Sequence, residues 1–97
     1  MATNYIKILD YIQTTHIEIT FIQTLADNGL LTLIVLEDQQ YIDEEQLPDL
    51  EKFSNWHYEL EVNHQGIEVA YHLLKKIEQL QQEIAQLKMK TKFIEEL

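Results

Sequence analysis

The chain has 97 residues, 45% of them hydrophobic, a composition typical of one small globular domain rather than of a disordered segment. It contains no cysteine, which excludes disulfides, thiolate nucleophiles and zinc–thiolate sites, and its net charge of −10 without any arginine disfavours nucleic acid as the main partner. The N-terminus has no apolar signal segment and no apolar run approaches 18 residues, so we expect a soluble, cytoplasmic protein.

Acidic residues dominate the stretch between Lys7 and Lys52, where His16 is the one residue that could be basic. The ten carboxylates there belong to Asp10, Glu18, Asp27, Glu37, Asp38, Asp43, Glu44, Glu45, Asp49 and Glu51. Such a surface repels phosphate and attracts basic partners. The alternative interpretation is a solvated face that only maintains solubility.

Two short helices are predicted first. Residues 5–16 show helical apolar spacing at Ile8, Leu9, Tyr11 and Ile12, after a possible stub of strand, and a second helix follows over about 19–28 with Phe21, Ile22 and Leu25 on one face. A tight turn at 15–18 joins them, which is the helix-turn-helix pattern, and Gly29 ends the second helix. His16 in this turn is expected to serve the backbone, because histidine tolerates left-handed conformation, rather than catalysis.

A strand over 31–36, a polar turn over 37–40 and a short strand over 41–42 predict a hairpin, or wing. Asp43 with Gln46 three residues later has the capping-box arrangement and predicts the start of a third helix, with Pro48 in its first turn. The expected inner face of that helix consists of Leu47, Leu50, Phe53, Trp56, His57 and Leu60. Trp56 and Tyr58 are expected to pack into the core, or to be exposed as a partner anchor.

A longer fourth helix, capped by Asn63, is predicted from about 65 to the C-terminal end. Its apolar positions alternate in steps of three and four, which is typical of a coiled-coil seam. The seam consists of Ala70, Leu73, Ile77, Leu80, Ile84, Leu87, Thr91 and Ile94. We therefore expect a winged helix-turn-helix head over 1–62 and a dimerisation helix over 63–97, with Leu73, Ile77, Leu80, Ile84, Leu87 and Ile94 in the dimer interface. A lone exposed helix or one folded back on the head is the alternative.

This order of elements resembles the MerR group of proteins, which implies a mainly α, MerR-like winged helix-turn-helix fold with a long C-terminal coiled-coil helix. The resemblance centres on Ile17, Ile22 and the run Gly29-Leu30-Leu31. The sequence departs from the MerR pattern at the DNA-reading positions. The arginine of the pattern falls on Gln23, its two tyrosines on Thr24 and Leu25, and its glutamate on Ala26.

Within this group the chain is most similar to the chaperone modulator CbpM family. The similar segment runs from Leu60 to Leu80 and includes Val62-Asn63 followed by Gly66-Ile67, the junction before the coiled coil. The resemblance implies a non-enzymatic protein that binds the J-domain of a DnaJ-like co-chaperone, which for CbpM itself is CbpA. It would occupy the basic helix that engages the Hsp70 partner DnaK, and so inhibit the co-chaperone. A lysine-free acidic face is the electrostatic complement of such a helix.

We expect Asp10, Glu18 and Asp27 to contact that partner, with Tyr11 as an apolar anchor. A MerR-type DNA-binding transcription regulator is the alternative, and a structural adaptor that binds through its coiled coil is a third. Enzyme activity is not expected, because Ser54 lies within a predicted helix and the two glycines form no phosphate loop. His64, Glu68 and His72 have helical spacing but are expected to be structural, so neither a metal nor another cofactor is predicted.

Overall fold

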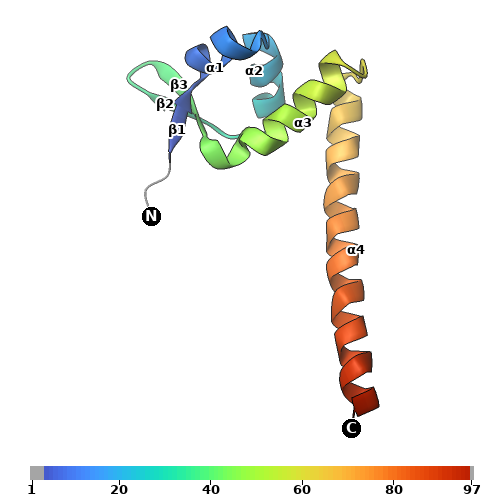
Figure 1. The fold of residues 1–97 in the computed structure, drawn as a ribbon. Coiled ribbons are helices and arrows are strands. Elements are labelled where there is room, and N and C mark those ends of the chain that lie inside the picture. Colours follow the sequence, from blue (N-terminus) through green and yellow to red (C-terminus); the bar gives the residue numbers. More distant parts are fainter. Residues whose placement is uncertain (1–3, 97) are drawn as a thin grey trace.

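A computed structural model describes residues 4–96 and confirms the winged helix-turn-helix architecture (Figure 1). The compact head is followed by one helix that extends away from it. The elements in chain order are β1 (Tyr5–Lys7), α1 (Ile8–Thr15), α2 (Ile19–Asp27), β2 (Leu33–Leu36), β3 (Gln39–Asp43), the 3-10 turn η1 (Glu44–Gln46), α3 (Leu47–Tyr58) and α4 (His64–Glu96).

Local backbone geometry fixes the helix-turn-helix. His16 ends α1 in the left-handed conformation, with φ of 61°, as predicted for this turn. At the end of α2, Gly29 has φ of 79°, the N–H of Leu30 donates to the carbonyl of Leu25, and the N–H of Gly29 donates to that of Ala26. This pair of bonds is the Schellman motif, which satisfies the last carbonyls of the helix and turns the chain toward the wing.

The sheet has the order β1-β3-β2, with both pairs antiparallel, so the predicted strand stub becomes an edge strand of the wing. The hairpin turn is shorter than expected. Gln39 already pairs with Leu36, and only Glu37 and Asp38 lie between the strands, with φ of 50° and 65°. Two left-handed residues are enough to reverse a twisted hairpin, which is why the strands extend further into the predicted turn.

Only half of the predicted capping box between Asp43 and Gln46 is present: Asp43 is an N-cap, but Gln46 does not bond back to it. The Asp43 carboxylate accepts a hydrogen bond from the N–H of Glu45 at 2.9 Å and caps η1 rather than α3. The side chain of Gln46 instead binds both backbone groups of Thr32, at 2.8 and 2.9 Å. This clamp occupies the groups that Thr32 would need for strand pairing, and β2 therefore begins at Leu33 rather than at 31.

The prediction for Leu60 is also wrong. Helix α3 ends at Tyr58, and Leu60 lies beyond it with 67% of its surface exposed. Leu50 and Phe53 of the expected inner face are buried, and Leu47, Trp56 and His57 are partly buried. In α1, Leu9 is more exposed than its apolar character suggests, because the helix turns mainly Ile8 toward the core.

One core joins all parts of the head. It consists of Ile8, Phe21, Ile22, Leu25, Leu30, Leu31, Ile42, Leu50, Phe53 and Ile67. Ile67 comes from the first turn of α4, so this helix is anchored in the head at its start. From Lys75 onward every described side chain of α4 is exposed, and the helix extends away as a single rod (Figure 1).

Candidate partner-binding surfaces

The net negative charge of the protein belongs entirely to the head. Residues 1–62 hold twelve carboxylates and two lysines, whereas residues 63–97 hold five of each. Among the described residues the one ion pair joins Lys75 to Glu78 on α4, at 3.6 Å. The carboxylates of the described part of the head therefore have no lysine within bonding distance, and their field acts on the surroundings.

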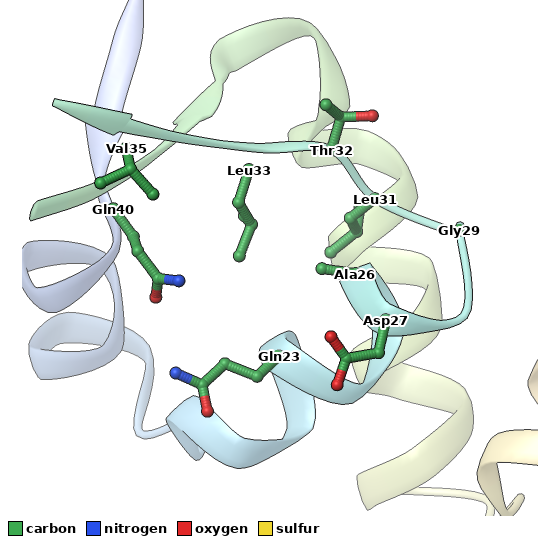
Figure 2. Close-up of a pocket in the computed structure, with 9 residues that line it drawn as sticks. All are labelled: Gln23, Ala26, Asp27, Gly29, Leu31, Thr32, Leu33, Val35 and Gln40. Carbon is green, nitrogen blue, oxygen red and sulfur yellow. The ribbon is translucent and has the colours of Figure 1, made fainter.

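A groove of about 600 Å³ separates α2 from the wing (Figure 2). Its walls carry Gln23 and Ala26 from α2 and the apolar side chains of Leu33 and Val35 from β2. Asp27 is the one charged residue in the lining. Two positions where the sequence departs from the MerR pattern, Gln23 and Ala26, thus face this groove, while Leu25 is buried in the core.

A second groove, of about 480 Å³, lies between α1, the following turn and α3. Tyr11, Ile17 and Tyr58 contribute aromatic and aliphatic surface to it, and Glu51 and Glu59 contribute carboxylates. The hydroxyl of Tyr58 accepts a hydrogen bond from the N–H of Glu18 at 3.1 Å, which ties α3 to the start of α2. Burial raises the pKa of Tyr11 above its usual value, and the Glu51 carboxylate adds to this rise.

The four residues predicted to contact the partner are not brought together into one site. Tyr11 lies in the α1–α3 groove and Asp27 in the α2–wing groove, while Asp10 and Glu18 are exposed outside both linings. Sequence reasoning missed Glu51 and Glu59, and it gave Tyr58 only as an alternative partner anchor. Their spacing of seven and eight residues places them on one helical face, a signal that pointed to a shared surface.

The junction between the head and α4 is tightly packed. The Asn63 side chain accepts a hydrogen bond from the N–H of Gly66 at 2.8 Å, which confirms the predicted cap. A Cβ atom on Gly66 would approach Cγ1 of Val62 to 2.7 Å, so a side chain at this position would force Val62 to move. Phe21, His57 and His64 stack beside the cap, with ring centroids 4.6 to 5.3 Å apart.

The predicted seam on α4 lies open to solvent. Its leucine and isoleucine side chains from Leu73 to Ile94 are between 43% and 68% exposed. Ile84, Leu87, Lys88 and Thr91 surround a hollow of about 310 Å³ together with Lys92. The spacing of the first four is that of the hole which receives a side chain from a partner helix in a coiled coil.

The histidines of α4 do not gather ligands. His64 packs against Phe21 and His57, and His72 is exposed beside Tyr71. Within residues 4–96 no three histidine, aspartate or glutamate side chains are close enough together to hold a metal ion. Over the same range, no helix combines the length and apolar character needed to cross a bilayer.

The helix-turn-helix, the hairpin beside it and the long terminal helix define the class of winged helix-turn-helix proteins. More narrowly, the chain belongs to the MerR family: the model described as MerR HTH family regulatory protein matches residues 6–89. Neither the curated proteins nor the solved structures contain a significant match to it.

Proposed function

We propose that this protein is a non-enzymatic, cytoplasmic modulator that binds the basic J-domain of a DnaJ- or CbpA-type co-chaperone and competes with the Hsp70 partner for it. One observation carries the proposal. The whole net charge of −10 belongs to the head, which holds twelve carboxylates and only two lysines, with no lysine between Lys7 and Lys52. A partner that complements this surface must be basic.

The same observation argues against DNA as the ligand. A helix-turn-helix protein places its second helix in the major groove and gains most of its affinity from contacts between cations and phosphates. Here α2 has Asp27 in its last turn, and the wing has Glu37 and Asp38 at its tip. Helix α2 and the β2–β3 hairpin therefore offer a duplex carboxylates and no lysine for phosphate contacts.

Calorimetric titration with the J-domain of the host's DnaJ-like protein, at low and at moderate salt, tests the proposal. We expect saturable binding that weakens as salt rises, because screening reduces the attraction between exposed charges. A competition titration with Hsp70 then tests whether the two proteins exclude one another. No binding at either salt concentration would disprove the co-chaperone proposal.

We further propose that the protein is a homodimer in which two α4 helices pair along the seam. An exposed row of apolar side chains is removed from water when a second helix packs over it. The row continues for about six turns beyond Tyr71, the last residue of α4 that packs against the head core, which supports a partner helix rather than packing onto the same head.

A MerR-type transcription regulator is the second candidate, and the family match favours it. Its test is fluorescence anisotropy with labelled duplex DNA over a series of salt concentrations. Tight binding that falls steeply with salt would support this candidate, since it would indicate phosphate contacts. Binding to the J-domain but not to DNA would reject it.

A further inference from the structure

The groove between α1 and α3 combines apolar walls with negative charge. The rings of Tyr11 and Tyr58 and the side chain of Ile17 form its hydrophobic surface. Glu51 and Glu59, both exposed, come from the α3 side of the same groove. A long side chain with an aliphatic stem and a cationic end would therefore find a suitable environment along its whole length.

No residue that lines this groove is a lysine, and His16 is the one lining residue that could become positive. The Glu51 carboxylate is close enough to the Tyr11 hydroxyl to raise the pKa of that phenol, so the carboxylate and the ring belong to the same local environment. Cations are attracted both by carboxylates and by the faces of aromatic rings. The groove thus presents two kinds of attraction for a cation without an internal cation to satisfy them.

The α2–wing groove is less suited to a cationic partner. Its lining has one carboxylate, that of Asp27, and no aromatic side chain (Figure 2). Its polar groups are the neutral amides of Gln23 and Gln40, together with Thr32. A partner helix is about 10 Å across, so we expect it to lie over a groove and to insert individual side chains.

We propose that the α1–α3 groove receives a lysine or arginine side chain from the basic helix of the J-domain. This assignment rests on the proposed function. The aliphatic stem lies against Tyr11, Ile17 and Tyr58, and the cationic group pairs with Glu51 and Glu59. The partner helix then lies across the rim formed by α1 and α3, rather than along α2.

Two matched double variants of the full chain test this assignment. E51Q/E59Q removes the two carboxylates of the groove, and E37Q/D38Q removes two carboxylates at the tip of the wing. Both variants change the net charge equally, and all four side chains are exposed. Circular dichroism and thermal unfolding establish that each variant is folded. Calorimetric titration with the J-domain at low salt then gives the two affinities.

We expect E51Q/E59Q to weaken binding about 10-fold and E37Q/D38Q to weaken it less than about 3-fold, since two charge pairs are lost only in the first. In amide NMR spectra, the J-domain should shift the signals of Thr15, Ile17 and Asn55 more than that of Val35. Equal affinities of the two variants, or shifts confined to the α2–wing groove, would overturn the groove assignment and leave the proposed function standing. Absence of binding to the unmodified protein would overturn both.

Discussion

Tyr11 and Glu51 form a pair whose interaction can be measured directly. Burial and the neighbouring carboxylate both disfavour the charged phenolate, so the pKa of Tyr11 lies above the ordinary value of 10.0. Substitution of Glu51 by glutamine removes the second cause and should lower this pKa, though not to its ordinary value. Absorbance at 295 nm during an alkaline titration, with Y11F to identify the Tyr11 component, measures the change.

The sign of the linked pH dependence follows from the same shift. A tyrosine with a raised folded-state pKa makes its full contribution to stability below pH 10, and this contribution is lost as the pH rises through the folded-state value. Urea denaturation should therefore show a steeper loss of stability above pH 10 for the unmodified protein than for Y11F. Equal slopes for the two proteins would show that Tyr11 is not the responsible group.

Gly66 illustrates a residue whose role becomes visible only in three dimensions. An alanine normally stabilises a helix relative to glycine by about 1 kcal/mol. Here the new methyl group would meet the Val62 side chain at 2.7 Å and the Asn63 oxygen at 3.2 Å. We expect Gly66→Ala to lower the free energy of unfolding by about 1 kcal/mol, because overpacking outweighs the gain in helix propensity. Urea denaturation measures the difference.

Val62→Ala provides the control for this explanation. The shorter side chain removes the clash, so V62A/G66A should be less destabilised than the sum of the two single variants. Gly29→Ala makes a useful contrast, because nothing lies within 4 Å of its Cβ position and only its φ of 79° opposes the substitution. Strict additivity in V62A/G66A would contradict the role assigned to Val62.

At the scale of elements, the wing turn carries conformational strain that can be relieved. Glu37 and Asp38 both have positive φ, which costs a residue other than glycine about 1 kcal/mol or more. Asparagine followed by glycine is the preferred pair in such two-residue turns. E37N/D38G should therefore raise the free energy of unfolding by about 1 kcal/mol, measured by urea denaturation. E37Q/D38Q removes the same charges without easing the backbone, and an equal gain in this variant would assign the effect to charge instead.

Elements defined by local patterns could be predicted from the sequence. The apolar spacing of α2, the glycine after it and the Asn63 cap were sufficient to locate these features, because their causes lie within a few residues. The start of β2, which was predicted wrongly, depends on a distant partner. Gln46 binds Thr32, fourteen residues earlier, rather than capping α3, and no local pattern indicates this contact.

The grooves were beyond sequence reasoning for a similar reason. Tyr11 and Glu51 lie forty residues apart in the chain and meet only because α1 packs near α3. Acidic character predicted the chemistry of the surface but not which carboxylates share a hollow. The predicted contacts Asp10, Glu18 and Asp27 all belong to the helix-turn-helix, whereas the groove also includes the neighbouring face of α3.

At the scale of the whole molecule, charge and apolar exposure are separated along the chain. The head has the whole net charge and buries its apolar residues around one core, whereas α4 is neutral overall and exposes its seam. This division allows the two parts to have different partners. A head that repels its own copies through charge can still be held in a pair by a neutral helix.

The seam yields the sharpest prediction at this scale. L80E/I84E places two carboxylates four residues apart in the centre of the seam, where a paired helix would have to bury them without counterions. We expect the unmodified protein to be a dimer and this variant a monomer with less helical signal, because the terminal part of α4 then lacks tertiary support. Light scattering coupled to size-exclusion chromatography gives the mass, and circular dichroism at 222 nm gives the helix content.

Q82E/Q86E is the matched control, since it adds two carboxylates at the same spacing on the opposite face of α4. This variant should remain a dimer. We expect the unfolding temperature to rise with protein concentration for this variant and for the unmodified protein, but not for L80E/I84E. Dimerisation through the seam requires that L80E/I84E be a monomer while Q82E/Q86E is a dimer. If L80E/I84E stays dimeric, the contact between protomers lies on the head, and the exposed row of leucine and isoleucine side chains on α4 must be covered by a different protein.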